Sequence, residues 1–255
     1  MTRQPSKLAY ILGTQRSGST LTDLLLNNHP KVQTTGEFHR ISMYIRDGLE
    51  PFTCGQAVQE CPFWLSVEAA ARRSTPCRDG ELLLASLDPM LYPKNVSRVR
   101  EAFQKALLLL GIRPLYEEFI PFIVPPHYKA IQNSLFWYGK IAQVAGASVV
   151  LDSTKDPRRM KMLYMHDAKR VRIIHTLRDG RGVAASKMRR EGVTMDMAAS
   201  AFKFQAGRAL LAARTVSHQH LLRVRYEDLC RNPEKTVRGL CGFLGLDFFP
   251  EMLAI

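Results

Sequence analysis

The sequence has 255 residues, of which 46% are apolar, and its formal net charge is +13 at pH 7. This length suits one large domain, or one domain with an insertion, and the apolar content is enough to bury a full core. The lysines and arginines are spread along the chain without a run of five or six. The charge therefore favours a phosphate-rich small molecule as partner at least as much as a nucleic acid, which binds a basic stripe or patch.

The sequence gives no sign of a secreted or membrane protein. The first apolar run has only about five residues, fewer than the core of a signal peptide needs. No run approaches the ~18 apolar residues of a membrane span. The five cysteines include no C-x-x-C pair, so we expect reduced thiols and no zinc or other metal site. These features predict a cytoplasmic protein without a transmembrane segment.

The first expected unit is a strand, a glycine-bounded loop and a helix. An apolar run at residues 8–12 leads into the loop 13–20, which reads GTQRSGST, and a helix-like run follows from Leu21 to about Asn28. Glycines allow the tight turn that points successive backbone N–H groups at an anion, and the helix N-terminus adds its positive dipole end. The alternative interpretation is an ordinary turn whose helix is capped by a serine or threonine side chain.

The spacing of Gly13 and Gly18 matches the phosphate loop of nucleotide hydrolases, but the residues after it differ. That loop continues with lysine and then serine or threonine, whereas this chain has Ser19 and Thr20. The lysine that reaches the β- and γ-phosphates is therefore missing, and the cation of the loop is Arg16. The loop also carries three hydroxyl side chains: Ser17, Ser19 and Thr20.

The middle of the chain, residues 41–126, is irregular and rich in proline and glycine. Short helical stretches are expected at 64–73, 81–87 and 96–110. It follows a short extended piece at residues 32–35 and the pair Gly36-Glu37. We expect a mostly helical insertion on the acceptor side that covers an active site.

Regular alternation of helices and strands resumes after residue 134. The expected helices are 134–145, 158–166 (with Asp156 as N-cap), 183–190, 195–215 and 234–244 (with Asn232 as N-cap and Gly245 after its end). The expected strands are 148–151, 171–177 and 221–226. This alternation predicts an α/β fold with a central parallel sheet flanked by helices. Polar residues follow each strand, and we expect them to meet in one crevice beyond the carboxyl ends of the strands.

Two motifs together resemble the sulfotransferase family. They are the loop 13–21 and the run 177–186, which reads LRDGRGVAAS. Members use 3′-phosphoadenosine-5′-phosphosulfate (PAPS) as sulfuryl donor, and the arginine in the loop with Gly36-Glu37 most resembles tyrosylprotein sulfotransferases and many bacterial members. The resemblance spans roughly residues 8–246. It implies a fold like that of P-loop nucleotide hydrolases, with residues 1–255 forming a single sulfotransferase domain.

The resemblance also implies which residues bind PAPS. Arg16 would contact the bridging and leaving oxygens of the phosphosulfate, and Arg178 with Ser186, eight residues on, would bind the 3′-phosphate. An arginine suits this role because its guanidinium donates two parallel hydrogen bonds to a phosphate. Tyr226 would stack on or hydrogen-bond the adenine. The remaining expected donors to the 5′-phosphate are Ser17, Gly18, Ser19 and Thr20.

Each of these assignments has a plainer alternative. Arg178 could simply form an ion pair with Asp179, Ser186 could be an ordinary helix serine, and Tyr226 could be half-buried core. The family further carries a basic, glycine-containing segment after its last helix. This sequence ends at Ile255, so either that segment is missing from it or the nucleotide pocket is open at one side.

The implied reaction is an in-line transfer of a sulfuryl group to a hydroxyl or amine, in which positioning and electrostatics dominate. A sulfuryl group has one negative charge fewer than a phosphoryl group, so we expect no metal requirement. Lys155 resembles the second cation of the family, and Glu37 is the candidate general base. His39 and Asp156 are the alternative bases. The sequence does not identify the acceptor.

Two other functions compete with this one. A nucleoside-triphosphate-dependent kinase or hydrolase would use the run 149–152, which ends in Asp152 and reads like a magnesium-holding strand. It is disfavoured by Ser19 in place of lysine. A basic binding module for nucleic acid or sulfated polymers fits the net charge, but no basic strip with interleaved aromatic residues supports it.

Overall fold

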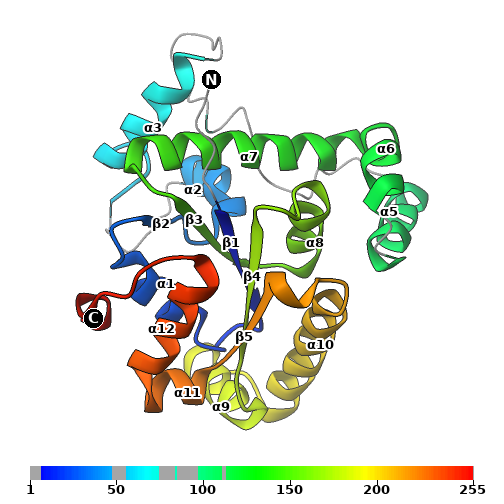
Figure 1. Ribbon diagram of the computed structural model, residues 1–255. Helices are drawn as coiled ribbons and strands as arrows, with labels where there is room; N and C mark the ends of the chain where they lie inside the picture. The colour runs from blue at the N-terminus through cyan, green and yellow to red at the C-terminus, as the bar shows by residue number, and fades with distance from the viewer. Residues whose placement is uncertain (1–6, 48–55, 75–83, 85–96, 111–112, 255) are drawn as a thin grey trace.

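A five-stranded parallel sheet forms the centre of the computed structural model, which describes residues 7–47, 56–74, 84, 97–110 and 113–254 (Figure 1). The strand order is β2-β3-β1-β4-β5, and every pairing is parallel. The strands are β1 (Lys7–Gly13), β2 (Val32–Thr34), β3 (Val149–Lys155), β4 (Val171–Leu177) and β5 (Leu221–Arg225). This confirms the predicted α/β class with a central parallel sheet.

Helices cover both faces of the sheet (Figure 1). The side chains of β1 alternate between two cores, because successive residues of a strand point to opposite faces. Leu8, Tyr10 and Leu12 pack with α3 (Pro62–Arg72), α7 (Pro125–Ala145), α8 (Pro157–His166) and α10 (Met195–Ala213). Ala9 and Ile11 pack with α1 (Ser19–Asn27) and α12 (Pro233–Leu244). The sheet is thus buried on both sides, and its ligand-binding region is left to the strand ends.

Several predicted boundaries are wrong by a few residues. β3 runs to Lys155 instead of ending at Leu151, because the polar side chains of its last residues are buried and paired rather than solvated. α7 begins at Pro125, nine residues before the predicted start. Tyr226 is not the last residue of a strand but the first of a helix, α11 (Tyr226–Arg231). Asn232 flanks α12 without a side-chain cap.

Other predicted features hold in the structure. Asp156 caps α8, and its side chain accepts hydrogen bonds from the backbone N–H groups of Arg158 and Arg159. Gly245 ends α12 in the left-handed conformation, with φ 68°. The helix predicted at 183–190 is also present, as α9 (Gly180–Glu191), although it begins three residues earlier than predicted.

The described part of residues 41–126 is helical. It contains α2 (Ile41–Asp47), α3, α5 (Arg98–Leu110), α6 (Arg113–Ile123) and the first residues of α7. α6 was not predicted, since Pro121 lies inside it. The helix predicted at 81–87 lies outside the described residues except for Leu84. No helix in the ranges that the structure describes is long and apolar enough to cross a membrane.

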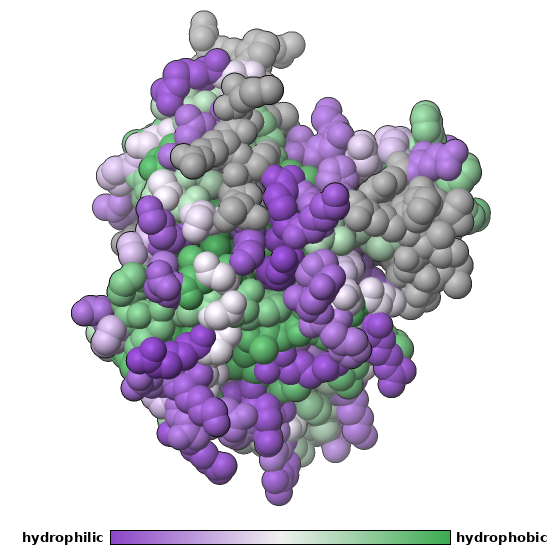
Figure 2. All heavy atoms as spheres, in the orientation of Figure 1, coloured by the Kyte–Doolittle hydropathy of each residue, from purple (hydrophilic) through white to green (hydrophobic). Residues whose placement is uncertain are grey.

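Hydrophilic side chains form several separate groups on the face shown in Figure 2, with apolar strips between them.

A buried ion pair holds the carboxyl end of β3. Arg159 of α8 and Asp152 of β3 are both fully buried, and the Arg159 Nε lies 3.0 Å from the Asp152 Oδ2. Arg159 also donates to the Tyr138 hydroxyl at 2.8 Å and to the Ser134 hydroxyl at 3.0 Å. The other Asp152 oxygen accepts hydrogen bonds from the backbone N–H and hydroxyl of Thr154. This network joins β3, α7 and α8 just before Lys155.

We expect Asp152→Ala to destabilise the protein strongly. The variant leaves the Arg159 guanidinium buried without its partner, which typically costs about 3–5 kcal/mol of unfolding free energy. The matched control is Asp167→Ala, which breaks the more exposed pair of Asp167 with Arg170 and should cost at most about 1 kcal/mol. Urea denaturation measures both values. Equal losses in the two variants would show that the buried pair is not a principal anchor of β3.

Candidate functional site

Two adjoining cavities lie at the carboxyl ends of the strands. One has a volume of about 310 Å³ and is lined by residues that include Gly13, His39 and Arg208. The other has a volume of about 490 Å³ and includes Thr20 among its lining residues. Glu37 and Lys155 line both. The strand ends thus meet in one region, as the topology predicts.

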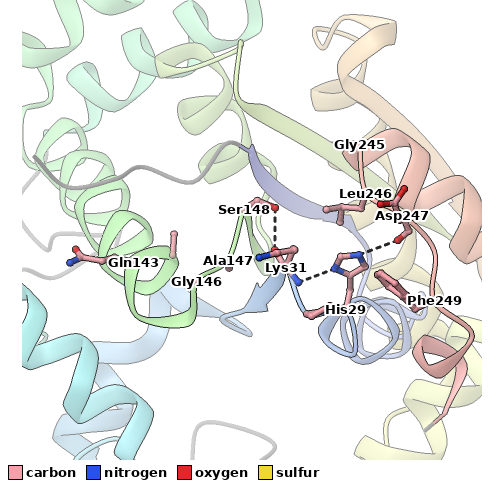
Figure 3. A pocket seen from close by; sticks show the side chains of 12 residues that line it. His29, Lys31, Gln143, Gly146, Ala147, Ser148, Gly245, Leu246, Asp247 and Phe249 are labelled. Atoms are coloured by element: carbon pink, nitrogen blue, oxygen red, sulfur yellow. Dashed lines mark hydrogen bonds between the residues drawn. The ribbon is translucent and has the colours of Figure 1, made fainter.

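Another cavity, of about 730 Å³, lies at the opposite edge of the sheet (Figure 3). His29, Lys31 and Ser148 line it, and they precede β2 and β3 instead of following them. None of the predicted site residues lines this cavity. We therefore place the functional site at the two smaller cavities.

The loop 13–20 has the geometry of an anion cradle. Gly18 is the N-cap of α1 with φ 90°, and no described side chain caps this helix. The alternative of a serine or threonine cap is therefore wrong, and the first N–H groups of the helix have no capping partner. A Cβ on Gly18 would lie 2.5 Å from the Tyr226 ring, and one on Gly13 would lie 2.5 Å from the Thr176 hydroxyl. A larger residue at either position would therefore collide with a neighbouring side chain.

Arg16 lies in this loop in the left-handed conformation, with φ 63°. Its guanidinium forms a partly exposed ion pair with Glu191 of α9, with 3.3 Å between Nη2 and Oε1. Its Nε is buried and has no hydrogen-bond partner among the described residues. A buried donor without a partner is rare and costly, and an anion bound in the loop would satisfy it.

Ser17 differs from what the sequence predicts. Its hydroxyl is buried, donates to the Thr14 carbonyl at 2.7 Å and lies 2.8 Å from the Thr176 hydroxyl. The side chain therefore holds the loop against β4, and the backbone N–H is the donor that Ser17 has left for an anion. The backbone N–H of Gln15 is not available to an anion either, because it donates to the Gln205 side chain of α10 at 3.0 Å.

Arg178, which follows β4, reaches across to the loop. Its Nη1 donates to the Arg16 carbonyl oxygen at 2.9 Å, and its Cζ lies 4.0 Å from the centre of the Tyr226 ring. The plainer alternative of an ion pair with Asp179 is not what forms, because Asp179 pairs with Arg181 at 2.7 Å. The cations of the two predicted anion sites, 162 positions apart in the sequence, are therefore neighbours.

Ser186 and Tyr226 take different places beside Arg178. Ser186 is half-buried in the second turn of α9, and no hydrogen bond joins it to Arg178 in the part of the chain that is described. Tyr226 lies against both Gly18 and Arg178, so it contacts the site and is not simply core.

Lys155 and Glu37 form the other half of the site. The Lys155 Nζ lies 2.8 Å from the Glu37 Oε1 and donates to the Ser153 carbonyl at 2.7 Å. Lys155 has φ 68°, a left-handed conformation that costs a non-glycine residue about 1–2 kcal/mol. Glu37 also pairs with Arg40 at 3.4 Å. Strained residues at strand ends are typical of functional sites.

The two alternative bases are less well placed than Glu37. His39 lies 3.2 Å from the Thr154 hydroxyl through Nδ1, and burial, followed by the charge of Arg159, lowers its pKa to about 4. Asp156 uses a carboxylate oxygen to accept two backbone N–H groups at the start of α8. It is thus committed to capping.

Sequence reasoning missed Asp23, which lines the larger of the two cavities. Burial raises the pKa of its carboxyl from 3.8 to about 7, although the Ser153 hydroxyl and the Lys155 charge act in the opposite direction. Its Oδ1 has no hydrogen-bond partner among the residues described. Nothing in the sequence marks this residue, since one aspartate in the second turn of a helix is common.

The structure removes the main support for a kinase or hydrolase. Asp152, which would have to hold magnesium, is fully buried in the ion pair with Arg159. In the described ranges, no group of three histidine, cysteine, aspartate or glutamate side chains could hold a metal ion.

The comparison with known proteins finds one family similarity. Residues 136–251 match the family model described as "Sulfotransferase family", a segment that contains Lys155, Arg178, Ser186 and Tyr226. This part of the chain is therefore similar to the sulfotransferase family. The match indicates a transferase enzyme, and no comparison supports the nucleoside-triphosphate-dependent alternative.

Solved structures with sulfotransferase folds are similar to the whole chain. The sulfotransferase domain of the olefin synthase from Synechococcus PCC 7002 is similar with a TM-score of 0.54 and 22% identity, over 98% of this chain and 77% of that one. The sulfotransferase domain from the curacin biosynthetic pathway is similar with a TM-score of 0.54 and 18% identity, over 98% of this chain and 77% of that one. Sulfotransferase STF1 from Mycobacterium tuberculosis H37Rv gives 0.51 and 16%, over 99% of this chain and 70% of that one. No curated protein sequence shows significant similarity to the chain.

The raised pKa of Asp23 predicts a pH-dependent stability difference. Because the folded protein binds the Asp23 proton up to about pH 7 and the unfolded chain only up to about pH 4, the wild type loses stability as the pH rises through this window. Asp23→Asn stays neutral and lacks this loss. Urea denaturation at pH values from 4 to 8 measures the unfolding free energy of both proteins. As the pH rises, the unfolding free energy of the variant should increase relative to that of the wild type, by an amount on the order of 1–4 kcal/mol. Parallel curves for the two proteins would contradict the raised pKa.

Proposed function

We propose that this protein is a sulfotransferase that uses PAPS as donor and transfers the sulfuryl group to a hydroxyl or amine of an acceptor. The observation that carries the proposal is the hydrogen bond between Arg178 and the Arg16 carbonyl, which places two separate cations at one crevice. PAPS has a 5′-phosphosulfate and a 3′-phosphate and thus needs two anion sites. We further propose that residues 1–255 act as one domain, with 41–126 on the acceptor side.

The loop 13–20 would hold the phosphosulfate. The open N–H groups at the start of α1 and the Arg16 Nε are donors without protein partners in the described residues. The further donors are the backbone N–H groups of Ser17, Gly18, Ser19 and Thr20, together with the Thr20 hydroxyl, since Thr20 is exposed. Donors held in this way stabilise negative charge without reorganisation, which lowers the barrier for a leaving group that gains charge.

Arg178 and Ser186 would bind the 3′-phosphate. The Tyr226 ring and the Arg16 carbonyl hold the Arg178 guanidinium in place, so binding would not have to order a mobile side chain. Ser186 would add a hydroxyl from α9. One face of the Tyr226 ring is covered by Arg178, so Tyr226 would contact the adenine with its edge or its other face.

Lys155 and Glu37 would carry out the transfer. In the reaction, the bond from sulfur to the bridging oxygen breaks while a bond forms between sulfur and the acceptor oxygen or nitrogen. Glu37 would accept the acceptor proton, and Lys155, 2.8 Å away, would stabilise charge on the transferring group. Glu37 lines both cavities, so it adjoins the donor and the acceptor at once.

We expect Arg16→Ala to lower kcat for sulfuryl transfer about 10²- to 10³-fold, the usual effect of removing one charge-stabilising donor. The release of 3′,5′-adenosine bisphosphate from PAPS measures turnover, with alcohols, phenols and amines supplied as acceptors. The control is Arg181→Ala, because Arg181 is 93% exposed and pairs only with Asp179 among the described ion pairs. Unchanged turnover in Arg16→Ala would remove Arg16 from the mechanism.

A further inference from the structure

The geometry points to Asp23 as the residue that selects the acceptor, and to a neutral acceptor with several hydroxyl groups, such as a sugar or another polyol. Asp23 would bind one of these hydroxyls inside the 490 Å³ cavity. This inference rests on the proposed function and deepens it, since the family does not name the acceptor.

The cavity is correctly placed for an acceptor. It is lined by Lys155 and Glu37, the proposed catalytic pair, and by Thr20 of the proposed donor loop. An acceptor bound here would therefore lie between the general base and the sulfuryl group. The volume of about 490 Å³ falls in the range typical of small-molecule sites.

Asp23 has a buried carboxyl oxygen that lacks a hydrogen-bond donor. Its side chain is partly buried, and its Oδ1 atom is buried without a hydrogen-bond partner among the described residues. A carboxyl oxygen in such a place is stabilised by a donor from a ligand. The Ser153 and Thr34 hydroxyls interact with this carboxyl group, but they leave its Oδ1 without a partner.

The charges around the cavity favour a neutral ligand. Lys155 lines it, so a cationic acceptor would be repelled there and by the +13 charge of the whole chain. Glu37 lines it as well, so an anionic acceptor would meet a carboxylate. A hydroxyl both donates and accepts hydrogen bonds without carrying charge, and it therefore suits this mixed lining.

The lining of the cavity contains both aromatic and polar side chains. Phe63 and Trp64 pack edge to face, with 5.5 Å between ring centres, and give the lining an apolar, aromatic part. Carboxyl, amide and hydroxyl side chains line it as well: Asp23, Asn27, Gln33, Thr34 and Ser153. A sugar ring matches both kinds of side chain, because it presents C–H groups on one face and hydroxyls around its edge. A simple phenol would match the aromatic side chains and leave Asp23 without a donor.

The test compares acceptor classes with PAPS as donor. Methyl glucoside, methyl galactoside and myo-inositol represent polyols, 4-nitrophenol represents phenols and phenethylamine represents amines. We expect transfer to at least one polyol by the wild type. In Asp23→Asn, KM for that polyol should rise at least tenfold, while KM for PAPS changes less than twofold. Asp196→Asn is the matched control, since Asp196 is exposed in the first turn of α10, and it should leave both values unchanged.

Each other outcome overturns the inference. Transfer to the phenol or the amine alone, an unchanged polyol KM in Asp23→Asn, or an equal rise for every acceptor class would exclude selection by Asp23. Thermal stabilisation of both proteins by 3′,5′-adenosine bisphosphate shows that the variant is folded and binds nucleotide. If the wild type lacks both this stabilisation and transfer, the proposed function itself fails, and the inference falls with it.

Discussion

The site depends on the hydrogen bond from the Arg178 guanidinium to the Arg16 carbonyl oxygen. This bond ties the loop after β1 to the end of β4, and Arg16, whose carbonyl accepts it, has a left-handed backbone conformation. The Tyr226 ring packs on the same guanidinium and on Gly18, where any Cβ would collide with the ring. Each of these four residues therefore requires the others. The result is a pair of cations held in fixed positions before any ligand arrives, which is the preorganisation that anion binding and charge stabilisation both need.

A second anchor positions the catalytic pair. The buried ion pair of Asp152 with Arg159 fixes the end of β3, and Thr154 is held by the same aspartate. Lys155 comes directly after these residues, in a strained conformation that places its ammonium beside Glu37. A buried charge pair contributes little net stability by itself, but breaking it is costly, so it specifies one arrangement of the strand end. In this fold, that specificity serves the residues that adjoin both cavities.

The sequence predicts the structural features that depend on neighbouring residues in the chain. The glycine-bounded loop, the alternation of strands and helices, and the Asp156 cap all follow from the chemistry of a few neighbouring residues. The missing parts depend on residues far apart in the chain. The polar end of β3 was predicted as a loop because its partners, Tyr138 and Arg159, lie on other elements. For the same reason, the Ser17 hydroxyl was assigned to the ligand although Thr176 engages it. The burial of one aspartate in α1 likewise follows from packing and leaves no trace in the sequence.

The account makes the Arg178 guanidinium the anchor of a 3′-phosphate site that is distinct from the loop. Thermal denaturation with 3′,5′-adenosine bisphosphate and with 5′-adenosine monophosphate, in the wild type and in Arg178→Ala, tests this claim directly. The account predicts a clear upward shift of the wild-type Tm with the bisphosphate, a smaller shift with the monophosphate, and loss of the difference between the two nucleotides in the variant. Equal responses of the two proteins to the bisphosphate would contradict it.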